Sequence, residues 1–96
     1  MITSKQRAKL RGIANNIDTI FQVGKSGIID TLVAQIDDAL VAREIVKVKV
    51  LENAPIGARA AAQEVAEKIG CDIVQVIGTK FVLYKRNNKK PIIDID

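Results

Sequence analysis

The sequence predicts a single compact domain of the α/β (α+β) class, in which packed helices cover a four-stranded mixed sheet. The expected order of elements is α-β-α-β-α-β-β. Three segments repeat apolar residues at helical spacing, four shorter ones alternate or run apolar as strands do, and short connections containing Gly, Asn or Pro separate them. The length of 96 residues fits one domain. We assign this domain to residues 1–86 and expect residues 87–96 to form a polar, flexible tail.

The first helix is expected to begin at a cap, Thr3 or Ser4, and to run to about residue 14. Its inward stripe at helical spacing comprises Gln6, Leu10, Ile13 and Ala14. Two pairs of cations flank this stripe, Lys5 with Lys9 on one side and Arg7 with Arg11 on the other. Charges at the edges of an amphipathic helix are usually solvated, but four cations without one acidic residue also match a polyanionic ligand. Both interpretations stay open.

The stretch Gly24-Lys25-Ser26-Gly27, called the glycine loop below, follows an expected strand over residues 19–23. We expect it to open a long amphipathic helix over residues 28–43. The unpaired N–H groups at a helix start and the positive end of its dipole attract anions. Glycines let a phosphate approach the backbone, Lys25 adds a charge, and Ser26 can cap the helix or donate to a phosphate oxygen.

The glycine loop has two interpretations. Its Gly-x-x-Gly spacing clamps nucleic-acid backbone in KH modules, and the same spacing is common in ordinary turns. If the loop binds phosphate, a side chain at Gly27 is expected to hold the phosphate away from the helix start.

A second strand is expected over residues 45–51, because Val46, Val48 and Val50 alternate with lysines. For Lys47 and Lys49 we favour a solvent-facing or edge-protecting role over ligand binding. A loop over residues 52–57 then leads into a third helix over residues 58–69, and Gly70 is a well-placed stop.

The last two strands are predicted as a hairpin, residues 72–77 and 80–86, around a type II′ turn at Gly78-Thr79. This register places two pairs on one face, Val76 opposite Phe81 and Val74 opposite Leu83. The other face then receives Ile73, Gln75, Ile77, Lys80, Val82 and Tyr84. Such a face is too apolar to stay bare, and the first helix is the candidate to cover it.

Composition argues against several classes of function. The chain has no His and a single Cys, Cys71, so neither a zinc site of the usual kind nor an internal disulfide is expected. The adjacent carboxylates Asp37 and Asp38 point in different directions on a helix, and they match a solvated face better than a catalytic pair. We therefore expect no enzyme, no cofactor and no small-molecule substrate. The formal charge of +4 suits a polyanionic partner.

The sequence also bears on location. No apolar run approaches the roughly 20 residues that cross a bilayer, and the polar, basic start lacks the apolar core of a signal peptide. We expect a cytoplasmic monomer without membrane contact.

Four stretches occur together in one order: Val23-Gly24-Lys25-Ser26-Gly27, Glu44-Ile45-Val46-Lys47-Val48-Lys49-Val50, Val74-Gln75-Val76-Ile77-Gly78 and Val82-Leu83-Tyr84-Lys85. With the basic first helix, they resemble the CRM family (chloroplast RNA splicing and ribosome maturation) and its YhbY-like bacterial members. The resemblance spans about residues 2–86. It implies a fold similar to the C-terminal domain of bacterial translation initiation factor three, with a KH-like glycine loop. Two positions depart from the family pattern: Arg43 stands where His is common, and no Pro occurs within residues 15–19.

The resemblance implies RNA as the partner, and in particular ribosomal RNA of the large-subunit precursor, because bacterial members associate with such precursors. The residues expected to bind it are Gly24, Lys25, Ser26, Gly27, Lys5, Arg7, Lys9 and Arg11. The loop amides and Lys25 would hold a phosphate, and the cations of the first helix would bind further phosphates of the same RNA. The chain has only three aromatic residues, so base readout should be poor. The alternative is a protein-interaction module that uses a sheet face or binds an acidic partner protein.

Overall fold

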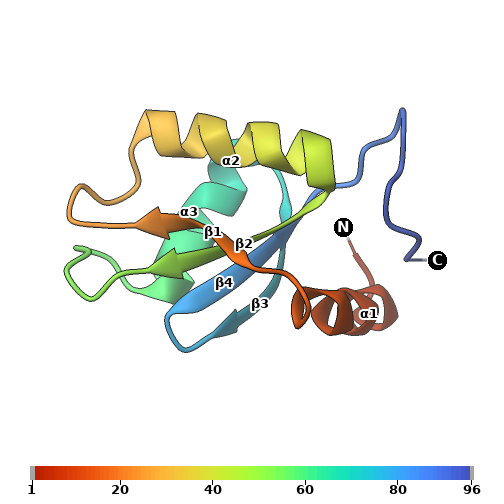
Figure 1. Cartoon of the computed structure of the whole chain (residues 1–96), viewed down its shortest axis with the longest axis horizontal. Coiled ribbons are helices and arrows are strands. Elements are labelled where there is room, and N and C mark those ends of the chain that lie inside the picture. Colours follow the sequence, from red (N-terminus) through yellow and green to blue (C-terminus); the bar gives the residue numbers. More distant parts are fainter. Residues whose placement is uncertain (1, 96) are drawn as a thin grey trace.

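Residues 2–95, which the structure describes, form three helices and a four-stranded sheet in the predicted order (Figure 1). In this computed structural model the elements are α1 (Ser4–Ala14), β1 (Thr19–Val23), α2 (Asp30–Arg43), β2 (Ile45–Val50), α3 (Ala58–Ile69), β3 (Asp72–Ile77) and β4 (Lys80–Tyr84). The strands lie in the order β1-β2-β4-β3, with β1 parallel to β2 and the other neighbours antiparallel. The predicted α+β class and mixed sheet are confirmed.

Local sequence signals explain the helix ends. The Thr3 hydroxyl accepts a hydrogen bond from the backbone N–H of Gln6 at 3.1 Å, and the Gln6 side chain accepts one from the Thr3 N–H at 2.9 Å. This reciprocal pair is a capping box, and it confirms Thr3 rather than Ser4 as the cap of α1. Helix α3 ends at Gly70, whose φ of 79° lies in the left-handed region that favours glycine.

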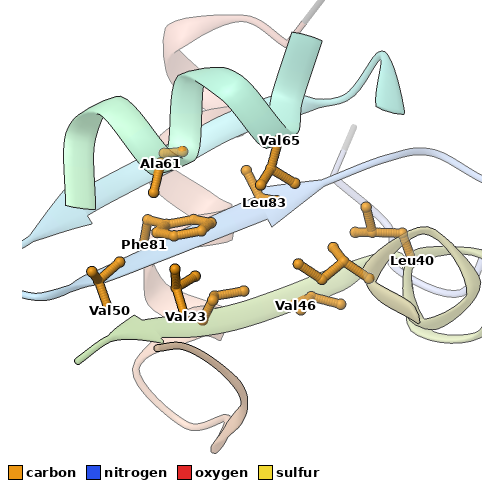
Figure 2. Close-up of a cluster of buried hydrophobic side chains, with 11 residues drawn as sticks. Val23, Leu40, Val46, Val50, Ala61, Val65, Phe81 and Leu83 are labelled. Carbon is orange, nitrogen blue, oxygen red and sulfur yellow. The ribbon is translucent and has the colours of Figure 1, made fainter. Parts of the chain in front are cut away.

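Helices α2 and α3 pack on the sheet (Figure 1), and the larger core lies between these helices and one face of the sheet (Figure 2). The side chains of Val46, Val48 and Val50 alternate into it from β2, as the sequence predicted. Figure 2 shows Ala61 and Val65 of α3 directed at two side chains of β4, Phe81 and Leu83. Small residues on the inner face of α3 let the helix approach the sheet closely, and all four of these side chains are fully buried.

Helix α1 covers part of the opposite face. It buries Leu10 and Ala14 against residues at the start of β2 and the end of β4. The sheet residues in this second cluster are Ile45, Val74, Val82 and Tyr84. The expectation that α1 covers the apolar second face is therefore confirmed.

The hairpin register differs from the prediction at one point. Val76 pairs with Phe81 as expected, but the register shifts between Ile73 and Gln75, so Ile73 rather than Val74 pairs with Leu83. The extra residue is a β-bulge, which moves Val74 to the face beneath α1 and turns Ile73 toward the larger core. The predicted pairing of Val74 with Leu83, and the placement of Ile73 on the second face, were wrong.

The C-terminal segment, residues 87–95, has a polar composition and makes specific contacts with the rest of the domain. The backbone N–H groups of Asn87, Ile92 and Ile93 each donate to the Glu44 carboxylate at 2.6 Å. Ile95 is buried in the cluster beneath α1. One carboxylate thus ties this segment to the junction between α2 and β2.

Glu44 is fully buried and occupies the left-handed position, φ 66°, that ends α2. Burial by itself would raise the pKa of its carboxyl, but the three backbone N–H groups and the charge of Arg86 outweigh it. The pKa therefore lies below its ordinary value of 4.5. The carboxylate is charged at neutral pH, where it can accept all three bonds.

Candidate functional site

The glycine loop forms a tight turn between β1 and α2. The Gly27 N–H donates to the Gly24 carbonyl at 2.9 Å, which leaves Lys25 and Ser26 exposed at the tip. Helix α2 begins only at Asp30, two residues later than predicted, because the chain stays extended at Ile29. Ile29 is the cap and no side chain caps this helix, so the expected capping role of Ser26 was wrong.

Gly27 is required for packing of the loop. Its φ of 72° is left-handed, its position is buried, and an added Cβ would lie 3.2 Å from Cγ of Pro55. The absent side chain thus makes room for the neighbouring loop, residues 51–57, and leaves the turn closely seated against it. An added side chain at Gly27 would thus meet Pro55 first.

A hollow of about 400 Å³ lies between the glycine loop and the first turns of α2. Its lining residues are Gln22, Gly24, Lys25, Ser26, Gly27, Ile29, Thr31, Leu32 and Gln35. The polar lining groups are one ammonium, two hydroxyls and two side-chain amides, and no carboxylate is among them. Such a set of donors can hold a phosphate.

The four cations of α1 are not equivalent. Lys5, Lys9 and Arg11 are exposed, whereas Arg7 is half-buried and its Nε donates to the Ile73 carbonyl of β3 at 3.4 Å. Arg7 therefore helps to fix α1 on the sheet, and the other three present their charges to solvent.

The glycine loop and α1 lie at opposite ends of the sheet (Figure 1). The loop follows the C-terminal end of β1, together with the 51–57 loop and the β3–β4 turn, while α1 packs near the other end. The five residues of β1 span about 17 Å at about 3.3 Å each. The structure thus brings Gly24, Lys25, Ser26 and Gly27 together but leaves the α1 cations apart from them.

The sequence interpretation missed the position of two lysines. Lys47 and Lys49 lie on β2, which is an inner strand, so the edge-protecting role considered for them was wrong. Both are half-buried on the face opposite the larger core. Their alternation with valines was visible in the sequence, but the strand order was not.

Within residues 2–95 no group of three or more His, Cys, Asp or Glu side chains is placed to hold a metal ion. The Cys71 thiol is half-buried, and burial together with the charge of Asp72 raises its pKa to about 11. This thiol stays protonated at neutral pH, so it lacks the thiolate that nucleophilic chemistry requires. Asp37 forms an ion pair with Lys85, N to O 3.5 Å. None of the described helices is long and apolar enough to cross a membrane.

Comparisons with known proteins agree on one family. The family model described as the CRS1 / YhbY (CRM) domain matches residues 2–85. The chain is 39% identical over 95 residues to a Bacillus subtilis protein named "Probable RNA-binding protein YqeI", covering 99% of each chain. It is 26% identical to the Pseudomonas aeruginosa "Probable RNA-binding protein PA4753", covering 92% of this chain and 85% of the relative. The solution structure of SAV1595 from Staphylococcus aureus superposes with a TM-score of 0.77 at 42% identity, covering 98% of this chain and all of that one.

Proposed function

The chain belongs to the CRS1/YhbY (CRM) domain family, and from this premise we propose that it binds RNA through the phosphate backbone. The proposed RNA is ribosomal RNA of the large-subunit precursor, and the proposed role is assistance in assembly of that subunit. Relatives across most of the chain length are named as RNA-binding proteins, which supports RNA as the class of ligand.

The observation that carries the mechanism is the hollow at the glycine loop. Lys25 and Ser26 stand exposed at its rim, and its lining contains hydrogen-bond donors without a carboxylate. A phosphate there would gain charge-assisted hydrogen bonds from several directions. We assign Lys25 the main charge contact, and Lys5, Lys9 and Arg11 further contacts along the same RNA.

Recognition by this surface would depend little on base identity. Phe81 and Tyr84 are buried and Phe21 is packed against the larger core, so no aromatic side chain is left as a stacking platform among the described residues. Backbone contacts position an RNA without reading its sequence. Selection of a ribosomal precursor would then rest on RNA shape.

The alternative of a protein-interaction module loses part of its support. The most apolar part of its sheet face, around Ile45, Val82 and Tyr84, is covered by α1 and by Ile95 of the C-terminal segment.

The test is to crosslink the protein to RNA in living bacterial cells and to sequence the attached fragments. We expect large-subunit precursor sequences to be enriched, and enrichment to fall in Lys25→Ala relative to Lys68→Ala, an exposed lysine of α3. Enrichment of messenger or transfer RNA instead would contradict the ribosomal assignment. Absence of any crosslinked RNA would contradict RNA binding.

A further inference from the structure

One row of paired residues crosses all four strands at the end of the sheet that carries the glycine loop. Gln22 of β1 pairs with Lys49 of β2, Lys49 pairs with Lys80 of β4, and Lys80 pairs with Ile77 of β3. Paired residues in a sheet point to the same face, and neighbouring strands lie about 4.8 Å apart. The row therefore places the side chains of Lys49 and Lys80 next to each other on the two central strands, β2 and β4.

This row faces away from the larger core and lies outside the cover of α1. The residues before and after Lys49, Val48 and Val50, point into the larger core, so Lys49 points to the opposite face. The α1 cluster occupies the other end of that face, at Ile45 and Tyr84. Gln22 and Lys80 are exposed, and 62% of the surface of Ile77 is accessible to solvent.

The arrangement is electrostatically unfavourable without a partner. Like charges directly opposite each other in an antiparallel pair destabilise a sheet. Lys47 adds a third charge on the same face, one row nearer α1, where it pairs with Val82. Across residues 2–95, none of these three lysines makes an ion pair or a side-chain hydrogen bond. A ligand rich in negative charge would relieve the repulsion.

The three lysines also connect the two separate parts of the proposed RNA surface. Gln22, at one end of the row, lines the hollow of the glycine loop. At the other side, Lys47 lines a hollow of about 500 Å³ with Asn16 and Ile17, which directly follow α1. That hollow also contains Asp18 and Arg43, one charge of each sign. The three lysines thus lie on the sheet face between the hollow of the glycine loop and the hollow next to the end of α1.

We propose that Lys47, Lys49 and Lys80, the sheet-face lysines, form the middle of one continuous track for a single strand of RNA. The strand would run from the glycine loop, across the open end of the sheet, to the cations of α1. This inference rests on the proposed function and adds a binding surface to it. The surface carries repeated positive charges and one exposed apolar neighbour, Ile77. Such a surface is more complementary to a polyphosphate backbone than to another protein, whose surface mixes apolar and polar groups.

The experiment compares two double variants that remove the same charge. Lys49→Gln/Lys80→Gln alters the row, and the control Lys68→Gln/Lys89→Gln alters two exposed lysines outside it. The probe is a single-stranded oligouridylate of about 12 nucleotides, within the usual site sizes of about 4–16. Affinity is measured against salt concentration, and thermal unfolding is followed in parallel.

For the row variant we expect the log–log salt slope to flatten by about 1.4, from about 0.7 per phosphate contact. Affinity at about 0.1 M salt should fall on the order of 10-fold. Thermal stability should stay unchanged or rise, because a like-charge pair is removed. The control should change the slope much less. In the wild type, backbone amide signals of Gln22, Lys49 and Lys80 should shift on addition of the probe.

Three results would overturn the proposal. If the row variant matches the control while Lys25→Ala weakens binding, the proposed function stands and the sheet face is not part of it. The conclusion is the same if the wild type binds RNA but the amide signals of Gln22, Lys49 and Lys80 do not shift. The third result is that the wild type binds polyglutamate but no RNA, and that the row variant loses the binding to polyglutamate. The surface would then bind an acidic protein, and the proposed function would fail together with this inference.

Discussion

At the scale of single residues, Gly27 allows the glycine loop to pack closely and also leaves Lys25 exposed to a ligand. Its left-handed backbone forms the turn, its missing side chain leaves room for Pro55, and Lys25 lies exposed at the tip. Glycine is therefore needed at this position whether or not RNA is bound.

Replacement of Gly27 by Ala is expected to lower the free energy of unfolding by more than about 1–2 kcal/mol. That amount is the cost of a left-handed conformation for a residue with a Cβ, and the contact with Pro55 adds to it. Urea unfolding measures the change. The matched control is Gly70→Ala, which has a similar φ of 79° and no atom within 4 Å of the added Cβ. Equal losses in the two variants would show that the Pro55 contact is not restrictive.

Glu44 is the second residue whose role depends on the fold. Its carboxylate receives N–H groups that lie 43 to 49 positions later in the chain. A Glu that directly precedes a strand gives no local sign of such partners. Its burial and its left-handed backbone become understandable only once residues 87–95 are in place.

At the scale of elements, Glu44 determines whether the C-terminal segment stays docked. Glu44→Gln should lower the free energy of unfolding by about 1.5–3 kcal/mol, because an amide cannot accept as many N–H groups as a carboxylate. Hydrogen exchange at Asn87, Ile92 and Ile93 should accelerate more than exchange in β2. Glu52→Gln, at an exposed position, is the control. Unchanged protection of the three amides would contradict this account of docking.

The same contact predicts the direction of a pH effect. The pKa of Glu44 is lowered in the folded chain, so its stabilisation is complete above the ordinary value of 4.5 and disappears as pH falls through the lowered pKa. The protection of the three amides, measured relative to the intrinsic exchange rate at each pH, should therefore fall on acidification in the wild type and depend less on pH in Glu44→Gln.

Helix α1 and the C-terminal segment allow a second comparison between elements. Lys5→Gln/Lys9→Gln should weaken RNA binding more than Lys89→Gln/Lys90→Gln, measured at one salt concentration. Both pairs are exposed, but Lys5 and Lys9 project from an ordered helix at the end of the proposed track. Arg7 is left intact because it bonds to β3. A larger loss from the C-terminal pair would mean that the binding surface has been misplaced.

At the scale of the whole molecule, local patterns predicted the elements and missed their relative positions. The alternating valines of β2, the Thr3 cap and the Gly70 stop depend on neighbours within a few residues, and each was confirmed. The bulge at Val74 depends on distant contacts and was missed, and the contacts of residues 87–95 with Glu44 depend on positions far apart in the chain.

For the candidate site, too, the sequence predicted the local features but not their positions relative to one another. The sequence pointed to the glycine loop and the basic helix and placed a strand between them, but it did not show that the two parts lie at opposite ends of the sheet. It could not place Lys49 opposite Lys80, because that pairing follows from the strand order and the hairpin register together. Lys47 and Lys49, for which the sequence favoured a solvent-facing or edge-protecting role, are therefore proposed from the structure as part of the link between the two predicted parts.

The central claim is that RNA is held by its backbone, with little regard to sequence. Salt titration of binding tests it most directly, with the wild type and Lys25→Ala on two unrelated RNAs of equal length and matched structure. For the four contacts assigned to Lys25, Lys5, Lys9 and Arg11 on single-stranded RNA, we expect a log–log slope near about −3, from about −0.7 per phosphate, and contacts with the sheet-face lysines would make it steeper.

Lys25→Ala should flatten that slope by somewhat less than one unit and weaken both RNAs by similar factors. A shallow slope in the wild type, or a loss confined to one of the two RNAs, would show that bases or one particular RNA fold are read, and would contradict backbone capture.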